Sequence, residues 1–240
     1  GARRDRATNI KSASKSIVSA LVGIAIAEGT LDSVRQPIAT FFPRELGSDA
    51  DPRARAITIE DLLSMRAGLA STSFDGYGAW VRSPNWVRYA LTRPIVAEPG
   101  GRMLYSTGSS HLLSAILTKA AKTTTRAYAQ RELGAPLGIT IPSWARDPQG
   151  YDFGGNEMFF TARDMLKFGE LYRRRGQHNG KQLIPESWID KAWGEYTTSP
   201  YNGHHYGYHW WTREYARVKV HFAWGYGGQF IFVIPARQLV

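Results

Sequence analysis

The most uniformly apolar stretch of the chain runs from Ile17 to Ala27, and polar residues stand before and after it. Branched and small side chains follow one another so closely that almost every helical face is apolar. A helix of this kind is buried in a core or in a membrane. The run is shorter than the roughly 20 apolar residues that span a bilayer. The pattern therefore predicts a buried central helix over 12–28, whose N-terminus opens on something polar.

The rest of the chain changes character about 35 residues before its end. Helices are expected over 59–65, 86–91, 107–121, 126–133, 162–175 and 185–193, with Thr58 as a cap and Pro185 at a first helical position. Aromatic and β-branched residues then alternate over 206–212, 216–224 and 229–235, which indicates antiparallel strands. Helices first and strands last predict an α+β fold, an antiparallel sheet with packed helices plus an all-helical region.

This pattern is interpreted as a single domain over 1–240. The helical part would cover about 30–200 and the sheet part about 201–240, with the helix over 12–28 at their interface. The Gly- and Ser-rich stretch over 66–80 is expected to be a long loop on the rim of a site. The chain begins about a dozen residues before a candidate nucleophile and ends as a strand begins. Truncation at both ends is therefore expected.

Composition narrows the function classes. A hydrophobic content of 43% over 240 residues suffices for one sizeable core. The formal net charge of +10 is scattered, and no nucleic-acid recognition module accompanies it, so no nucleic-acid partner is expected. The absence of cysteine excludes disulfides and thiolate metal sites. The histidines His204, His205, His209 and His221 lack metal-ligand spacing, so no metal is expected.

Candidate chemistry stands at the start of the central helix. Ser12 and Lys15 are three residues apart, which places both side chains on one helical face. A serine hydroxyl needs a base, and a lysine can be that base where burial lowers its pKa. The tetrad Ser-x-x-Lys alone is weak, because it arises by chance about once in a chain of this length. Its position before a buried helix strengthens it, whereas Ser14 and Ser16 are interpreted as caps or polar packing.

Two further segments are less specific by themselves. Tyr105 precedes a second apolar helix, and a nearby lysine ammonium would favour its phenolate, so that it could relay a proton. Alternatively, it is an ordinary tyrosine at the edge of the core. Near the end, Gly225, Gly227 and Gly228 interrupt a strand. They mark either a close backbone approach to a ligand or a hairpin turn.

The chain resembles the serine β-lactamase and penicillin-binding-protein superfamily in the order of three motifs: Ser-x-x-Lys, a tyrosine at a helix start, and a Gly-rich strand near the end. The resemblance covers nearly the whole chain. It extends to "KSASKSIVSALVGIAIAEGTLD", "ITIEDLLSMRAGL" and "GGNEMFFTARDMLKFGELY". It is greatest to the class C-related branch, which includes family VIII carboxylesterases, D-aminopeptidases, DD-peptidases and 6-aminohexanoate-dimer hydrolases.

The resemblance implies a role for each matching residue. Ser12 would be the acylated nucleophile, Lys15 its base and Tyr105 the proton relay. Thr107 stands where the branch usually has asparagine, which disfavours recognition of an acyl amide. The strand motif is represented by Ala223-Trp224-Gly225-Tyr226, without the lysine or histidine that would hold a β-lactam carboxylate. The backbone N–H of Tyr226 would be the second oxyanion donor beside that of Ser12, and Trp224 an apolar wall.

The sequence therefore predicts a serine hydrolase that cleaves a small ester or amide without a cofactor. One alternative is a β-lactamase or D-amino-acid peptidase that acts on cell-wall-like amides. Another is a non-hydrolytic, penicillin-sensor-like binding module. The sequence indicates no membrane span in this segment, and it leaves the oligomeric state open. The compartment, whether periplasmic, secreted or cytoplasmic, also stays open.

Overall fold

The computed structural model describes residues 5–47 and 50–240. Its α-helices are α1 (Ser14–Ala27), α2 (Pro43–Leu46), α3 (Pro52–Ala56), α4 (Ile59–Leu63), α5 (Tyr77–Val81), α6 (Trp86–Leu91), α7 (Thr107–Ala121), α8 (Thr125–Ala129), α9 (Ala135–Leu137), α10 (Ala162–Arg173) and α11 (Glu186–Ala192). The short 3₁₀ turns are η1 (Lys11–Ala13), η2 (Ile38–Thr40), η3 (Phe74–Gly76) and η5 (Pro235–Arg237), and η4 (Gln130–Gly134) is a π-helical turn.

The main sheet is antiparallel throughout and has the strand order β5-β6-β7-β8-β9. Its strands are β5 (Thr197–Thr198), β6 (His205–Tyr206), β7 (Trp211–Tyr215), β8 (Val218–Gly225) and β9 (Gln229–Val233). Two small antiparallel pairs lie outside it: β1 (Thr8–Asn9) with β2 (Phe159–Phe160), and β3 (Gln177–His178) with β4 (Lys181–Gln182). The α+β fold class predicted from the sequence is confirmed.

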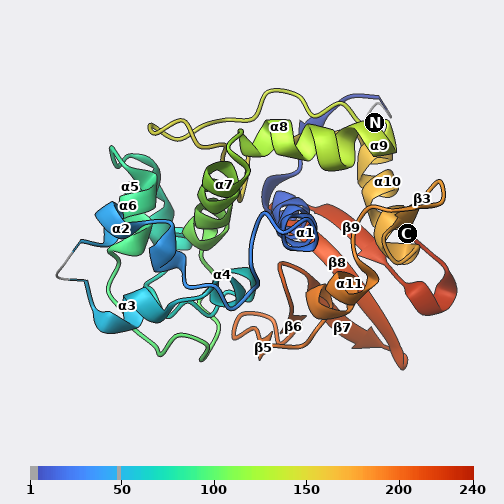
Figure 1. The fold of residues 1–240 in the computed structure, drawn as a ribbon. Helices are drawn as coiled ribbons and strands as arrows, with labels where there is room; N and C mark the ends of the chain where they lie inside the picture. Colours follow the sequence, from blue (N-terminus) through green and yellow to red (C-terminus); the bar gives the residue numbers. More distant parts are fainter. Residues whose placement is uncertain (1–4, 48–49) are drawn as a thin grey trace.

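Helix α1 lies at the centre of the molecule, between a helical side and the sheet (Figure 1). It packs against α7 on one side and against β8 on the other, and α10 covers β9. The side chains from Ser14 to Ala25 are all buried, as the sequence pattern predicts. The start of α1 is thereby placed where the helical side and the sheet meet.

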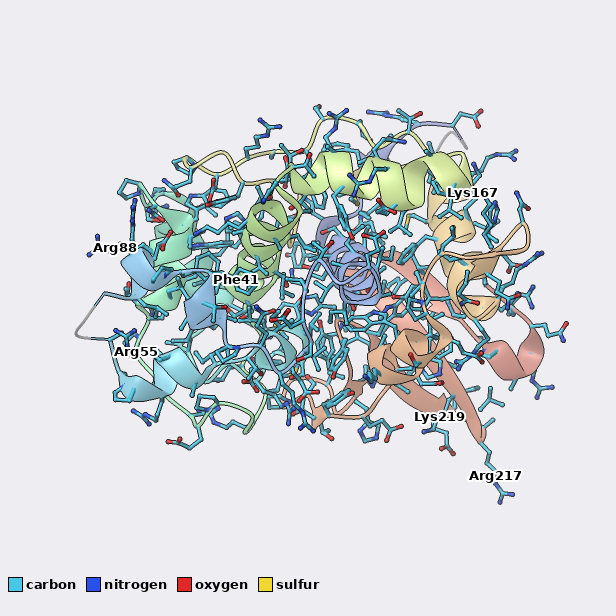
Figure 2. All side chains as sticks on the ribbon, viewed as in Figure 1. Phe41, Arg55, Arg88, Lys167, Arg217 and Lys219 are labelled. Atoms are coloured by element: carbon cyan, nitrogen blue, oxygen red, sulfur yellow. The ribbon has the colours of Figure 1, made fainter. Side chains whose placement is uncertain are left out.

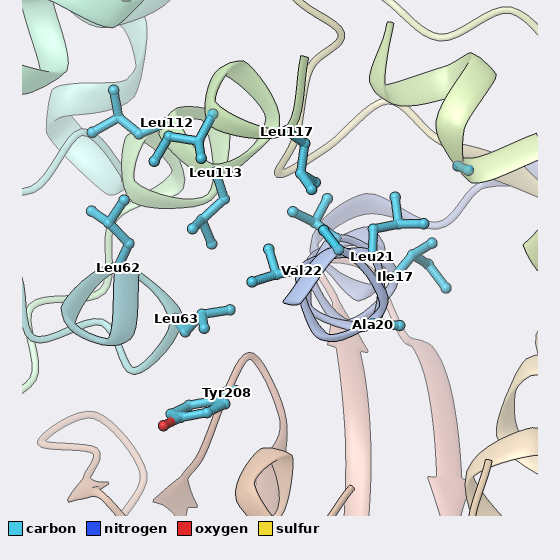
Figure 3. Close-up of a cluster of buried hydrophobic side chains, with 14 of the residues drawn as sticks. Ile17, Ala20, Leu21, Val22, Leu62, Leu63, Leu112, Leu113, Leu117 and Tyr208 are labelled. Carbon is cyan, nitrogen blue, oxygen red and sulfur yellow. The ribbon is translucent and has the colours of Figure 1, made fainter. Parts of the chain in front are cut away.

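The apolar contacts around α1 explain why this helix is so uniformly hydrophobic. Val22 points toward Leu63 of α4 and Leu113 of α7 (Figure 3), and all three side chains are buried. Burial of each such side chain contributes roughly 1.5–3 kcal/mol to stability. Charged side chains such as Arg55, Arg88, Lys167, Arg217 and Lys219 lie at the periphery (Figure 2).

Local sequence signals define several helix starts. Thr58 caps α4 through a reciprocal pair of bonds, since Asp61 N–H donates to Thr58 Oγ1 at 3.2 Å and Thr58 N–H donates to Asp61 Oδ2 at 2.9 Å. Thr161 and Asp164 repeat this capping box at α10. Such boxes satisfy backbone donors that have no partner within the helix. The expected cap at Thr58 is therefore confirmed.

Several predicted boundaries were wrong. The segment expected as one helix over 12–28 begins as the 3₁₀ turn η1, and α1 begins only at Ser14. Pro185 is the N-cap of α11 and not its first helical residue. The stretch over 66–80 contains η3 and the start of α5, because aromatic residues after Gly76 supply a buried face.

Other boundaries shift by a few residues. The helix expected over 126–133 begins at Thr125 and changes to the π-turn η4, and α10 ends at Arg173. The strand expected over 206–212 divides into β6 and β7, because a turn at Gly207–Trp210 intervenes. None of the helices in the described ranges is both long and apolar enough to cross a membrane.

Candidate active site

The predicted nucleophile and base meet at the start of α1. Ser12 lies in the middle of η1, and Lys15 is the second residue of α1. Lys15 Nζ lies 3.0 Å from Ser12 Oγ, which is within hydrogen-bond distance. The turn before them is fixed by the bond from Lys11 N–H to Asn9 Oδ1 at 2.8 Å. The spacing of three residues thus brings the two groups together, although Ser12 precedes the α-helix.

Lys15 is almost fully enclosed, with 1% of its surface exposed. Its Nζ donates to the carbonyl oxygen of Gly155 at 2.7 Å and to Thr107 Oγ1 at 3.4 Å. Burial penalises the charged ammonium and lowers the pKa of Lys15 to about 7. Near neutral pH a substantial fraction of this lysine is therefore an uncharged amine, which can accept a proton from Ser12.

Any residue other than glycine at position 155 would displace its neighbours. A Cβ at this position would lie 2.7 Å from Thr107 Cγ2 and 3.1 Å from Lys15 Nζ. Its carbonyl oxygen accepts the shortest of the hydrogen bonds that hold Lys15. In the sequence, this Gly-Gly segment stands out only as part of the family resemblance. Its function in holding Lys15 was missed, because the contact joins residues 140 positions apart.

Tyr105 completes the group around Ser12. Its hydroxyl is close enough to Ser12 for the two groups to interact, and Lys15 Nζ lies 5.3 Å from the centroid of its ring. The ring stacks against Trp211, with centroids 6.0 Å apart and planes at 19°. Tyr105 is therefore part of the site and not an isolated residue at the edge of the core.

The protonation state expected for Tyr105 was wrong. From the sequence, a nearby lysine ammonium was expected to favour the phenolate. Burial instead raises the pKa of Tyr105 to about 12, and the interaction with Ser12 offsets only part of this rise. Both groups are desolvated, and desolvation disfavours the charged form of each. The tyrosine is thus a neutral phenol beside a lysine that is easily deprotonated.

Thr107 is fixed from a second loop. Its Oγ1 lies 2.8 Å from Ser73 Oγ, and its N–H donates to the same Ser73 oxygen at 2.8 Å. In the same loop Ser71 Oγ donates to the carbonyl oxygen of Tyr105 at 2.6 Å. The Thr107 hydroxyl therefore helps to position Lys15, in addition to lining the cavity. The expectation that 66–80 borders a site agrees with these bonds.

The Gly-rich end of β8 approaches the nucleophile from the opposite side. A Cβ at Gly225 would lie 2.3 Å from the carbonyl oxygen of Ile10, so only glycine allows this contact. Gly227 and Gly228, at φ +102° and +92°, turn the chain back into β9. The segment is thus both a hairpin turn and a close backbone approach. Gly225, the residue before Tyr226, is thereby held against Ile10, two residues before Ser12.

One cavity of about 1040 Å³ unites most of the predicted residues. Ser12, Tyr105, Thr107, Trp224 and Tyr226 line it, whereas Lys15 and Gly225 are not among the lining residues. Its further lining consists of Lys11, Ser73, Phe74, Tyr77, Asn156, Glu157, Tyr201, Asn202, Trp211, Gly227, Gly228 and Phe230. Most of these were missed, because they come from loops without a periodic pattern.

A buried histidine lies behind the site. His209 is 2% exposed, its Nε2 is 3.0 Å from Ser110 Oγ, and its carbonyl oxygen accepts a bond from Ser16 Oγ at 2.6 Å. Burial and the charge of Lys15 lower the pKa of His209 to about 3, so it stays neutral. The bond from Ser16 agrees with its interpretation as polar packing. Ser14 is no cap, because the N-cap of α1 is Ala13.

The histidines do not converge on one point. His221 stacks on Trp193 with centroids 4.2 Å apart, and His204 packs edge-on against Phe222. Within the described ranges no group of three or more His, Asp or Glu side chains is arranged to hold a metal.

The fold has clear relatives. The family model described as Beta-lactamase matches residues 1–240, and the chain therefore belongs to the Beta-lactamase family. Its fold is that of the class C-like β-lactamase and penicillin-binding-protein superfamily, as the sequence motifs indicate. No curated protein matches the chain.

Solved structures agree with this assignment. The octameric penicillin-binding protein homologue from Pyrococcus abyssi is 20% identical with a TM-score of 0.79, over 99% of this chain and 61% of that one. A Bacillus anthracis protein, provisionally assigned as a 6-aminohexanoate-dimer hydrolase, is 20% identical with a TM-score of 0.78, over 98% and 66%. A D-stereospecific amidohydrolase from a Streptomyces species is 19% identical with a TM-score of 0.75, over 98% and 80%. The chain thus spans less than two thirds of the first two structures.

Proposed function

We propose that the protein is a serine hydrolase that cleaves an ester or amide through an acyl-Ser12 intermediate. The observation that carries the proposal is the 3.0 Å separation of Lys15 Nζ and Ser12 Oγ in an enclosure that lowers the lysine pKa to about 7. An uncharged amine at this distance can take the hydroxyl proton as the oxygen attacks a carbonyl.

The steps follow from this arrangement. Ser12 Oγ bonds to the acyl carbon while its proton passes to Lys15, and the carbonyl oxygen becomes an oxyanion. The backbone N–H groups of Ser12 and Tyr226 would stabilise that charge, since β8 approaches residue 10 closely at Gly225. The bond to the leaving group then breaks. Tyr105, which lies beside Ser12 and Lys15, passes a proton to the leaving atom and regains one from Lys15. Water repeats the sequence and releases the acid.

The site favours an ester over a β-lactam. The strand positions before Gly225 hold Ala223 and Trp224, which cannot pair with a substrate carboxylate. A cation at the rim, Lys11, lies 3.6 Å from Glu157 and is partly neutralised by it. Thr107 is engaged with Ser73 and Lys15. These features support an uncharged ester as the preferred substrate.

Turnover of p-nitrophenyl acetate by serine variants tests the proposal. Ser12→Ala should abolish hydrolysis, whereas Ser14→Ala should retain most of it. Ser16→Ala should also retain most activity, with some loss of stability because Ser16 donates a buried bond to His209. Circular dichroism would verify folding. Undiminished turnover by Ser12→Ala would refute the assignment of the nucleophile.

A further inference from the structure

Two exposed aromatic rings stand together on the cavity wall. Phe74 and Tyr201 are 63% and 57% exposed, and their centroids are 5.2 Å apart at an interplanar angle of 49°. They come from distant segments, the 3₁₀ turn η3 and the loop after β5. Paired rings that leave their outer faces open to a cavity can accept another apolar group.

The backbone at Phe74 is held in a conformation that a bulky residue rarely adopts. Its φ is +52°, in the left-handed region. The preceding residue is pinned to the site, because Ser73 N–H donates to Ser71 Oγ at 2.9 Å and Ser73 Oγ bonds to Thr107. Conformations of this kind persist where neighbours determine them, and they cluster at functional sites. The Phe74 ring is therefore kept at the cavity by the same loop that positions Thr107.

The position of the pair indicates which part of a substrate it would contact. The ring of Phe74 lies 6.1 Å from that of Tyr105, the proposed proton donor to the leaving group. The proposed oxyanion donors lie instead at Ser12 and at the end of β8. A leaving group that takes its proton from Tyr105 would therefore extend toward Phe74 and Tyr201.

The charge of the wall limits the chemistry of that group. The charged side chains among the described lining residues are Lys11 and Glu157, which face each other at 3.6 Å. Tyr77 and Trp211 are further aromatic residues in the lining of the same cavity. The surroundings thus favour an uncharged aromatic group over an anion or a cation.

We propose that Phe74 and Tyr201 form an aromatic subsite for the leaving group, and that the preferred substrates are esters of uncharged arylmethyl alcohols. This inference rests on the proposed acyl-Ser12 mechanism. In the reaction the bond from the acyl carbon to the alcohol oxygen breaks as the bond to Ser12 Oγ forms. The alcohol departs with a proton from Tyr105, and its ring lies against Phe74 and Tyr201.

Matched acetate esters test the subsite. Benzyl acetate and n-propyl acetate share an acyl group and have alcohols of similar acidity, so their difference reports on binding of the ring. Phe74→Ala and Tyr201→Ala should each lower kcat/KM for benzyl acetate roughly threefold to tenfold, mainly through KM. Hydrolysis of n-propyl acetate should change less than about twofold, since it offers no ring to stack. Tyr215→Ala, which removes a 73% exposed ring outside the cavity lining, is the matched control and should alter neither ester.

Two other outcomes would overturn the subsite. Equal losses for both esters would assign the rings a structural function. A selective loss for ethyl benzoate relative to ethyl acetate would place the aromatic group on the acyl side. Phe74→Leu, which retains apolar bulk, provides a second variant should Phe74→Ala be unstable.

A binding experiment separates this inference from the proposed function. Saturation-transfer NMR of benzyl alcohol with Ser12→Ala requires no turnover. Saturation transfer to the aromatic protons of benzyl alcohol should be observed with Ser12→Ala and should be weaker with the Phe74→Ala/Ser12→Ala double variant. This result would support the subsite, even if the parent hydrolysed no ester. Saturation transfer unchanged by loss of Phe74 would refute it, even if the parent were an active esterase.

Discussion

Lys15 Nζ and the carbonyl oxygen of Gly155 lie 2.7 Å apart, although 140 positions separate these residues in the chain. This bond is the shortest of the hydrogen bonds that hold the lysine. It explains why a side chain with 1% exposure can point at Ser12 without an acidic partner. The amine is held by neutral carbonyl and hydroxyl groups, and its pKa is lowered by burial.

The first prediction concerns this contact. Gly155→Ala would place a Cβ 3.1 Å from Lys15 Nζ and 2.7 Å from Thr107 Cγ2, so the lysine must move. We expect kcat for p-nitrophenyl acetate to fall about 10²-fold, as catalytic groups displaced by an ångström commonly cost that much. Gly78→Ala, where the nearest atoms are at the flexible tip of Arg82, is the control and should retain activity. Full activity of Gly155→Ala would contradict the prediction, because it would show that activity does not depend on this close contact with Lys15.

The pH dependence follows from the lowered pKa of Lys15. The base must be uncharged, so kcat/KM should rise with pH along a limb near 7 and level off above it. His209 cannot be the source of this limb, because its pKa is lowered to about 3. A profile measured from pH 5 to 9, corrected for spontaneous hydrolysis, decides the matter. A limb near 10, the ordinary value for lysine, would contradict the account.

The lowered pKa of Lys15 should also make the free energy of unfolding depend on pH, and the direction of that dependence can be predicted. The pKa of Lys15 is lowered from 10.5 to about 7 in the folded protein, so the unfolded chain binds more protons between these values. The free energy of unfolding should therefore rise with pH across this window, by on the order of 4–5 kcal/mol from this group. The destabilisation of the folded state is complete below about pH 7, where the buried amine must be charged.

Replacement of the lysine tests this directly. Lys15→Met should abolish activity yet stabilise the fold at pH 6, by roughly 1–3 kcal/mol after the lost bond to Gly155 is subtracted. The advantage should shrink toward pH 10. Lys181→Met, at an exposed position of β4, is the control. Urea denaturation at both pH values provides the measurement, and a destabilised Lys15→Met at pH 6 would argue against a buried charge.

Tyr105 offers a separate test of the proton relay. With a pKa raised to about 12, it is a neutral donor, and Tyr105→Phe removes the proton without removing the ring. The expected cost is on the order of 10²–10⁴ in kcat. The double variant with Lys15→Ala should be little worse than the poorer single variant, because members of one catalytic unit are not additive. Tyr89→Phe on α6 is the control, and a Tyr105→Phe enzyme within about threefold of the parent would remove Tyr105 from the mechanism.

Substrate class can be tested with two chromogenic compounds. The protein should hydrolyse p-nitrophenyl acetate, and its kcat/KM for nitrocefin should be lower by at least about 10–100-fold. The loss of a charged hydrogen bond to the substrate carboxylate accounts for a difference of this order. The relevant positions hold Ala223 and Trp224. Efficient hydrolysis of nitrocefin would favour the β-lactamase alternative.

How far the sequence predicts this structure depends on the range of the interaction. The helices α6 and α7 were bounded correctly, because their apolar periods and flanking turns are local signals. Ser12 and Lys15 meet for the same reason, since a spacing of three residues determines their proximity. The family resemblance added Tyr105, which no local pattern distinguishes from the other tyrosines.

Long-range contacts account for what the sequence did not predict. The bond between Ser73 and Thr107, and the bond that Lys15 donates to Gly155, connect loops that have no period of their own to the starts of α7 and α1. The raised pKa of Tyr105 depends on its burial against Trp211, which only the folded sheet reveals. The assignment of 1–240 to a single domain, with a helical part over about 30–200 and a sheet part over about 201–240, stays a prediction.

The central claim is that Ser12 becomes acylated. The most direct measurement is intact mass spectrometry of the protein, quenched in acid within the first turnovers of p-nitrophenyl acetate, followed by peptide mapping. The account predicts one added acetyl group on the peptide that contains Ser12, its decay as substrate is exhausted, and its absence in Ser12→Ala. A stable adduct would indicate a penicillin-sensor-like module, and turnover without any adduct on Ser12, or an acetyl group on another residue that turns over at the catalytic rate, would contradict the account.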